Sequence, residues 1–544
     1  MKKRLLSLIL ALCIIISFSP STLAANLPEV DVRTEGLTPA QPQEAPAEKP
    51  RDAGAERRTI YVSNEGTEED DGATAETPTT LARATELANE GKKPVEIVVL
   101  GQVSVDTWTS PTVETTLRGG DENAELLFEY CSASDGAYNI SLADALTIDD
   151  IKFNCNYTDY FFSRYYGTYT IVANGYPLVI ASGVQCSYYT ADTIVDGKTC
   201  STSSCYVIGG GLDEDITGGT HVEIYTSLPL TYVYGGGVNG SVESNVYLHI
   251  ENCGKIQHVR AGGYANKKDA KVNGNITLDF INSVTDNPIY GGGYARSSYS
   301  AEVTGSICIN LSGLNNGFGR PIYGGGYGKN APVVGNIRFN ISNTKMNNNA
   351  AAIYGGGYNS DVTGDIFIHI KENSLISEET VWGGGTGDST ITGGVTITVD
   401  DSSEVIGEIR AGGNEGADVI GDVVITVSGG PQSACPTIFA TGKGEDKDNP
   451  AQVDGNVSIT LHGSRANVYT LDKFGEVTSD HAVTIILDDT DELSGAVRGD
   501  SKLGQHLYNY EKNTPTRTGN GASVIVKGDY TSTGIHGFPE VVIE

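Results

Sequence analysis

The chain has 544 residues, of which 68 are Asp or Glu and 36 are Lys or Arg, so its formal net charge is −32. Nucleic acids and anionic membranes repel such an acidic protein, so neither is an expected partner. Beyond the first two dozen residues no apolar stretch approaches the roughly 18 to 20 residues that a membrane helix needs, which argues against membrane insertion.

The first 24 residues have the pattern of a removed signal peptide. Lys2, Lys3 and Arg4 precede an apolar run over residues 5–18, and Thr22-Leu23-Ala24 offers a small-residue cleavage site. Loss of these three positive charges takes the formal net charge from −32 to −35. We therefore expect a secreted, extracellular protein. The pattern leaves open how the protein is held at a cell surface.

Two segments precede the repeats. Residues 25–58 hold five prolines among many Glu and Ala, and this composition predicts a disordered linker. Residues 59–206 are predicted to form an N-terminal cap and irregular coils, with strands at 59–63 and 95–105 around a short helix at 79–88. This helix is expected to cover the open apolar end of the first coil. Its apolar face holds Leu81, Ala84, Leu87 and Ala88.

Residues 207–470 are built from a glycine-rich repeat. One half of each repeat is an aromatic or apolar residue before a glycine triplet, and the other half is a glycine before alternating apolar residues. Alternation with a period of two indicates a strand with one buried face. The glycines of the second half lie at 274, 305, 335, 364, 393, 421 and 455, so the coils are 28 to 34 residues long.

Coils of this length predict an all-β protein, a right-handed parallel β-helix (β-solenoid) with a short N-terminal capping helix. The blades of a β-propeller, the rival architecture, need about 40 to 50 residues. The right hand follows from the general preference of parallel connections. Glycine triplets are expected at the corners, where they permit positive φ and close approach of the backbone. Residues 471–544 are predicted to be C-terminal coils, and their strand-like end leaves open a truncated C-terminus.

A resemblance to a known superfamily is visible at the start of the folded sequence. The segment Tyr61-Val-Ser63, Gly66, Asp71-Gly72, Thr77-Pro78, Thr80-Leu81 and Ala84, followed by the strand at 95–105, resembles the first coil of the pectate-lyase-like right-handed β-helix superfamily. The Tyr-Gly-Gly-Gly coils resemble adhesin-like surface proteins of Gram-positive bacteria. The resemblance implies a fold more strongly than a function, since the superfamily includes polysaccharide lyases, glycosidases, phage tailspikes and non-catalytic adhesins.

The sequence shows no catalytic set of this fold. Paired aspartates at 149–150, 400–401 and 488–489 lack the accompanying Gly-His-Gly and Arg-x-Lys, so they are predicted to be turn residues. Arg260 and Arg410 are the best basic candidates for a lyase-like site. They lie about five coils apart and are expected to be solvated and outward-facing. No catalytic residue, metal ligand or cofactor is assigned, although Ca²⁺ at the acidic turns 213–215 and 384–388 stays open.

The cysteines permit disulfides without establishing them. Nine cysteines less Cys13 of the signal peptide leave eight, an even number in an exported chain. Cys200 and Cys205 flank a short Ser/Thr loop and are the best candidate pair. Buried free cysteines are the alternative.

The aromatic residues beside the glycine triplets are the candidate ligand-binding surface. Repetition from coil to coil should align them into ladders. Outward rings would offer a strip for sugar rings or apolar partner residues, whereas rings that stack on one another would only stabilise the fold, and this second interpretation is favoured. The candidates are Tyr234, Tyr290, Tyr323, Tyr354, Trp382, Tyr264, Tyr294, Tyr327 and Tyr358.

Together these features predict a secreted, adhesin-like and non-catalytic β-solenoid. It would present a polar and aromatic surface to an extracellular glycan or to a host or cell-surface protein. The alternative is a carbohydrate-active enzyme, either a polysaccharide lyase or a glycoside hydrolase, with its catalytic set in an irregular coil before residue 207.

Overall fold

The computed structural model describes the chain from residue 57 to residue 543 with short gaps. The chain divides into a segment over residues 1–55 and a unit Glu56–Glu544, and all described residues belong to the second. The predicted signal peptide, and the predicted linker except its last two residues, lie outside the described residues. The gaps are 130–137, 157–163, 166–167, 187–193, 196–197, 201–203, 255, 316–317, 347–350, 378–379, 430–435, 447, 465, 473, 479–480, 489–496, 502–507, 510–513, 516–522, 528–534 and 537–539.

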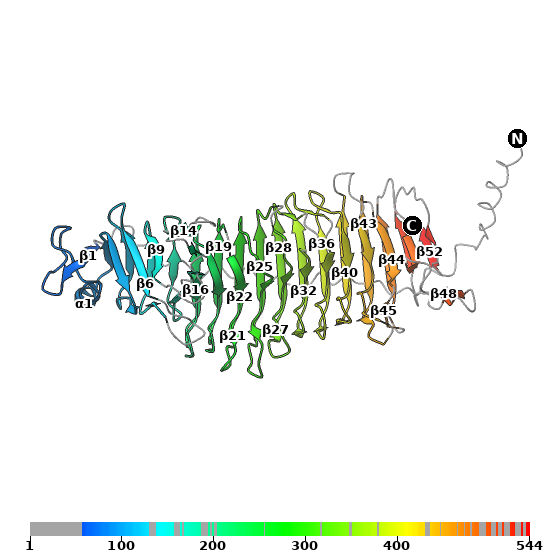
Figure 1. The fold of residues 1–544 in the computed structure, drawn as a ribbon. Helices are drawn as coiled ribbons and strands as arrows, with labels where there is room; N and C mark the ends of the chain where they lie inside the picture. The colour runs from blue at the N-terminus through cyan, green and yellow to red at the C-terminus, as the bar shows by residue number, and fades with distance from the viewer. Residues whose placement is uncertain are drawn as a thin grey trace, which may run out of the picture. The chain divides into compact units, whose positions relative to one another are not determined.

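The unit is a parallel β-solenoid of about 11 turns, which confirms the predicted fold class. Strands of successive coils lie side by side (Figure 1), and the described strand pairs are parallel except β14 with β15 and β48 with β49. The largest sheet has 17 strands and is called the long sheet. Its strands are β1 (Arg58–Thr67), β2 (Val95–Val99), β5 (Thr115–Gly119), β8 (Leu146–Asp149), β12 (Leu178–Ile180), β17 (Thr220–Ile224), β19 (Val246–Glu251), β22 (Ile276–Ile281), β25 (Ile307–Ser312), β28 (Ile337–Ser342), β32 (Ile366–Lys371), β36 (Val395–Val399), β40 (Val423–Ser428), β43 (Val457–His462), β46 (Val483–Asp488), β50 (Ser523–Lys527) and β52 (Glu540–Ile543).

A second sheet of 15 strands contains the residues that precede the glycine triplets, and it is called the triplet sheet. Its strands are β4 (Trp108–Thr109), β7 (Ile140–Ser141), β11 (Thr168–Val172), β16 (Ser204–Ile208), β18 (Leu230–Tyr234), β20 (Ile256–Arg260), β23 (Ile289–Tyr290), β26 (Ile322–Tyr323), β30 (Ile353–Tyr354), β34 (Thr380–Trp382), β38 (Glu408–Arg410), β41 (Thr437–Phe439), β44 (Asn467–Leu471), β47 (Val497–Ser501) and β51 (Ile535–His536).

Smaller sheets complete the coils. Four strands form one sheet, β3 (Gln102–Val105), β6 (Glu125–Glu129), β9 (Lys152–Asn156) and β13 (Gln185–Cys186), and six form another, β27 (Val333–Val334), β31 (Val362–Thr363), β35 (Thr390–Thr392), β39 (Asp418–Ile420), β42 (Ala451–Asp454) and β45 (Gly475–Val477). The remaining strands are β10 (Arg164–Tyr165), β14 (Ile194–Val195), β15 (Lys198–Cys200), β21 (Tyr264–Ala265), β24 (Tyr294–Ala295), β29 (Lys345–Met346), β33 (Leu375–Ile376), β37 (Glu404–Val405), β48 (Tyr508–Asn509) and β49 (Thr514–Pro515).

The core follows directly from the alternation seen in the sequence. In β22 and β25 every second residue, starting from Ile276 and Ile307, is buried and the residues between are partly exposed. The register joins Ile276 to Ile307 and Leu278 to Ile309. Like residues therefore stack on like residues from coil to coil. The buried side chains join into one continuous hydrophobic cluster along the coils.

The predicted helix is α1 (Leu81–Gly91), and its four predicted apolar residues are all buried. Thr80 caps its N-terminus by accepting a hydrogen bond from the backbone N–H of Arg83 at 3.1 Å. The buried face belongs to the main core cluster and contacts β1. Among the described residues, no helix is long and apolar enough to span a lipid bilayer.

The glycine triplets allow close approach of successive coils. A Cβ added at Gly324 would lie 2.3 Å from the carbonyl oxygen of Gly355, and one added at Gly355 would lie 2.3 Å from that of Gly383. The expected positive φ is absent from the triplets. It occurs instead where the chain leaves long-sheet strands, at Asn252, Asn282 and Asn343, because asparagine tolerates the left-handed region.

The candidate disulfide between Cys200 and Cys205 is not formed. Cys205 is a free, fully buried thiol, and burial raises its pKa far above the ordinary range. It therefore behaves as a small core residue, the alternative considered from the sequence.

We expect Gly324→Ala to destabilise the protein by about 1 to 3 kcal/mol, since the new methyl group collides with backbone that cannot move without disturbing the next coil. Gly218→Ala is the matched control, because a Cβ there meets nothing within 4 Å, and its effect should stay within about 0.5 kcal/mol. Urea unfolding of both variants measures the difference. Equal midpoints would contradict the close approach.

Candidate functional site

Four of the predicted binding residues form an aromatic row on the triplet sheet, here called the first ladder: Tyr290, Tyr323, Tyr354 and Trp382. The residue before each belongs to the main core, so strand alternation turns each ring to the outside of the coil. Successive ring centroids lie 5.1, 4.7 and 5.8 Å apart, and the planes differ by 6°, 13° and 5°. The side chains are only 5–8% exposed.

The predicted residues after the triplets form the second ladder: Tyr264, Tyr294, Tyr327 and Tyr358. The Tyr294 and Tyr327 rings are 4.2 Å apart at 7°, and those of Tyr327 and Tyr358 are 5.1 Å apart at 11°. Tyr264 meets Tyr294 edge to face at 5.8 Å. The two ladders also meet edge to face, as at Tyr290 and Tyr294, whose centroids are 5.5 Å apart at 75°.

This packing limits how the ladders can contact a ligand. Tyr234, the remaining predicted residue, also stacks, with Tyr232 at 5.7 Å and with Tyr264 at 5.8 Å. Rings within the stacked rows cover one another's faces, so a ligand reaches ring edges and hydroxyl groups there rather than the faces. A binding role for these nine residues stays a prediction.

Arg260 occupies the aromatic row between Tyr234 and Tyr290, and the expectation that it is solvated is wrong. It is 5% exposed, and its guanidinium carbon lies 3.5 Å from the ring centroid of Tyr294. Its Nη1 donates to the hydroxyl of Tyr234 at 3.2 Å. The electron-rich ring faces stabilise the buried cation in place of water.

Arg410 is also buried, at 4% exposure, which again corrects the expected solvated position. Its guanidinium pairs with Asp472 at 2.6 Å and with Glu408 at 2.8 Å. It lies in the same row between Trp382 and Phe439 and contacts both rings. Neither arginine therefore offers a free base for lyase chemistry.

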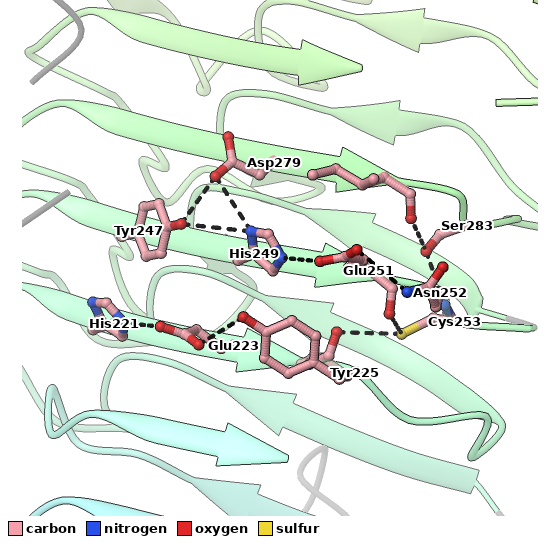
Figure 2. A network of polar contacts seen from close by, with 12 residues as sticks. His221, Glu223, Tyr225, Tyr247, His249, Glu251, Asn252, Cys253, Asp279 and Ser283 are labelled. Carbon is pink, nitrogen blue, oxygen red and sulfur yellow. Dashed lines mark hydrogen bonds and ion pairs between the residues drawn. The ribbon is translucent and has the colours of Figure 1, made fainter. Parts of the chain in front are cut away.

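The outer face of the long sheet carries a cluster of titratable side chains that we call the polar network (Figure 2). Strand alternation places every second residue of β17, β19 and β22 on this face, and the register sets Glu223 opposite His249 and His249 opposite Asp279. Its members are His221, Glu223, Tyr225, Tyr247, His249, Glu251 and Asp279.

One half of the polar network centres on Glu223. Nε2 of His221 lies 2.6 Å from Oε1 of Glu223, and the Tyr225 hydroxyl donates to Oε2 at 2.8 Å. The hydrogen bond with His221 lowers the pKa of the Glu223 carboxyl, and Tyr225 adds to this against the effect of burial. Both carboxylate oxygens are thus in use.

The other half centres on His249, which lies between two carboxylates. Its Nδ1 is 3.4 Å from Asp279 and its Nε2 is 3.2 Å from Glu251. Burial alone lowers the pKa of His249, but the two carboxylates outweigh burial and raise it. Burial likewise opposes ionisation of Asp279, yet hydrogen bonds from His249, Asn310 and Tyr247 lower its pKa.

The polar network is closed on itself. Tyr247 donates to Oδ2 of Asp279 at 2.9 Å and Asn310 donates to Oδ1 at 2.6 Å, so neither oxygen is free. Both ring nitrogens of His249 face carboxylates. A general base needs an acceptor that can reach the substrate, and the acceptor atoms of Glu223, His249 and Asp279 already take part in contacts within the polar network.

This cluster was not predicted from the sequence. The signal was present in the outward positions of adjacent coils, His221-Val-Glu223-Ile-Tyr225 and Tyr247-Leu-His249-Ile-Glu251. Only the register between the coils brings the two patterns together with Asp279.

The acidic turns considered for calcium bond neighbouring backbone or side chains. Asp213 accepts from Asn239 at 2.9 Å and Asp215 accepts from the backbone N–H of Ser241 at 2.7 Å. Of the paired aspartates that were predicted to be turn residues, Asp149 accepts a hydrogen bond from the backbone N–H of Asp150. Asp150 has a positive φ, which is typical of a turn. Over the described residues, no group of three or more His, Cys, Asp or Glu side chains is placed to hold a metal ion.

A groove of about 520 Å³ opens beside the second ladder. Such a volume falls in the range of small-molecule sites, roughly 300 to 1,000 Å³. The parallel bridges Tyr294–Tyr327, Tyr327–Tyr358 and Tyr358–Thr386 show that its lining comes from four consecutive coils. The lining residues are Ala295, Arg296, Tyr327, Gly328, Lys329, Asn359 and Asp388.

We expect Arg260→Ala to destabilise the protein by about 2 to 4 kcal/mol, since it leaves a cavity between rings that were packed on the side chain. Arg260→Met should cost less, because it fills the volume and removes a buried charge whose Nε has no hydrogen-bond partner among the described residues. Chemical unfolding of both variants tests this order. A larger loss in the Met variant would show that the charge matters more than the packing.

The His249 pairing predicts a pH-dependent stability. Because its pKa is raised in the folded state, the contribution is complete below the unfolded value of about 6.5 and is lost as the pH rises through the higher folded value. Asp279 and Glu223 have lowered pKa values, so their contribution is lost as the pH falls below about 4.

Burial lowers the pKa of His258 to about 4, so its contribution rises with pH up to about 6.5 and is constant above that. Denaturant midpoints from about pH 6.5 to 8 should therefore decline in the native protein and flatten in His249→Gln. His462→Gln, with a more exposed imidazole beside Asp488, serves as the control. An unchanged decline in His249→Gln would contradict the assignment.

Comparison with protein families, with curated proteins and with solved structures found no match to this chain. The structure supports the resemblance to pectate-lyase-like and adhesin-like proteins only at the level of the parallel β-helix fold, so function must be argued from the geometry of the site.

Proposed function

We propose that this protein is an exported, non-catalytic binding scaffold that presents the side of a β-solenoid to an extracellular glycan. The observation that carries the proposal is the groove beside the second ladder, whose lining comes from four consecutive coils. A groove that runs across coils fits an extended chain lying along the stacking direction. The resemblance to adhesin-like surface proteins and the predicted signal peptide support an extracellular location.

The groove favours a glycan over an apolar protein surface. The Tyr327 ring faces are covered by Tyr294 and Tyr358, so the groove offers its hydroxyl and edge, together with the polar side chains of Asn359 and its neighbours. Hydroxyl-rich sugars are recognised by such hydrogen-bonding groups, whereas a protein hot spot needs apolar pockets for its anchors.

The polar network also supports a non-catalytic function. Its histidines and carboxylates satisfy one another, and this arrangement stabilises the outer face of the long sheet without leaving an acid and a base free.

A carbohydrate-active enzyme is the second candidate, and the residue types of the polar network, rather than their internal pairing, are the observation that favours it. Two histidines and three carboxylates on neighbouring coils, with His221, Glu223, His249 and Asp279 at 12–17% side-chain exposure, are the residue types of acid–base catalysis. Catalysis would require substrate to displace one of the internal hydrogen bonds.

Purified full-length protein should bind members of a panel of neutral, acidic and amino-sugar polysaccharides without releasing reducing ends, with or without Ca²⁺. Tyr327→Phe keeps the stacking and removes the hydroxyl, so it should weaken binding roughly two- to ten-fold. Tyr323→Phe, on the buried first ladder, is the matched control.

Release of reducing ends that disappears in Glu223→Gln would overturn the non-catalytic proposal in favour of the enzyme. Absence of binding to every glycan in the panel would contradict the glycan partner.

A further inference from the structure

Three uncompensated charges line the groove. Arg296, Lys329 and Asp388 are exposed, and no oppositely charged side chain among the described residues lies within ion-pair distance of any of them. By contrast, Arg57 is paired with Glu114 and Arg118 with Glu96. Desolvating an unpaired charge is costly unless a ligand supplies the opposite charge.

The three charges share one position in the repeat. Each is the second residue after a bridged position of the second-ladder row, after Tyr294, Tyr327 and Thr386. The backbone before two of them is also alike, since Gly328 and Gly387 both have positive φ. Their side chains therefore start from equivalent places on three of four consecutive coils.

The sign of the charge changes along this row. The coils of Arg296 and Lys329 are adjacent, the next coil contributes the amide of Asn359, and Asp388 follows on the coil after that. With a coil spacing of about 4.8 Å, the acidic group lies on the order of 10 Å from the nearer cation and 14 Å from the farther one along the stack.

Local contacts orient these groups. Nε of Arg296 donates to the hydroxyl of Tyr294 at 3.1 Å, which fixes the guanidinium beside the ladder. The backbone N–H of Asp388 donates to the side-chain oxygen of Asn359 at 2.9 Å, which holds the acidic turn against the neighbouring coil. The binding groups are thus partly ordered before a ligand arrives, which lowers the entropic cost of binding.

From this arrangement we infer that the groove binds a zwitterionic glycan, in which an acidic sugar contacts Arg296 and Lys329 and a free amino group contacts Asp388. This inference rests on the proposed glycan-binding function and names the chemistry of its ligand. Asp388 would repel a purely anionic glycan, and Arg296 and Lys329 would repel a purely cationic one. Only a ligand with both charges pairs with all three.

The test uses oligosaccharides of alternating glucuronate and glucosamine in three forms: with free amines, with N-acetylated amines and with reduced carboxyl groups. Calorimetry with full-length protein should find the zwitterionic form bound roughly ten-fold more tightly than either modified form. High salt should weaken the preference.

Variants assign each charge to its partner. Asp388→Asn should weaken binding of the free-amine form about ten-fold and leave binding of the N-acetylated form unchanged. Lys329→Gln should weaken binding of the carboxylated form about ten-fold and leave binding of the carboxyl-reduced form unchanged. Glu445→Gln lies in the same row beyond the groove, and Lys443→Gln lies one coil past Asn414 on the ladder row, so these are the matched controls.

Equal affinity for the three forms, or an equal loss in Asp388→Asn for the free and N-acetylated forms, would overturn the inference. Binding of neutral glycans that depends on the Tyr327 hydroxyl but not on these charges would overturn only the zwitterionic ligand. Failure of every glycan to bind would overturn the proposed function as well.

Discussion

Backbone hydrogen bonding between successive coils in one register is the constraint on which the rest of this structure depends. Pairs such as Ile276 with Ile307 and Tyr290 with Tyr323 follow from it, and each repeats at the spacing of neighbouring strands. Any residue type chosen at one position of the repeat is therefore brought against its equivalents from the coils before and after. Apolar and aromatic residues gain from this arrangement, and like charges lose.

The aromatic row shows how the constraint is met when a charge enters it. Arg260 and Arg410 replace an aromatic residue in the same row, at places where both neighbours are aromatic. A planar guanidinium stacks on rings as an aromatic side chain does, so the row continues without a gap. Arg410 also forms ion pairs with two carboxylates, whereas Arg260 is surrounded by tyrosine rings.

The structure of one coil, and the stacking of coils where the repeat keeps the same residue type, could be predicted from the sequence, whereas contacts between unlike residues of neighbouring coils could not. The alternation around Leu278 is sufficient to identify a half-buried strand, and the apolar spacing from Leu81 to Ala88 is sufficient to identify the helix. The burial of Arg260 depends on side chains from other coils that surround it. The polar network depends on a register that sets His249 against both Glu223 and Asp279, which no single strand pattern contains.

The same constraint explains why charged side chains contact one another on the long sheet and remain apart beside the second ladder. On the long sheet, where every outward residue is flanked by two neighbouring strands, the titratable groups of the polar network alternate in type and neutralise one another. In the loops beside the second ladder, Arg296, Lys329 and Asp388 are exposed at one repeat position and have no ion-pair partner in the part of the chain that the structure describes. The chain has a net charge of −32. The two cations on adjacent coils therefore differ in sign from the protein as a whole, whereas the anion two coils further on has the same sign. A ligand that carries both signs is oriented by such a row, since reversing it would place each of its charges against a like charge.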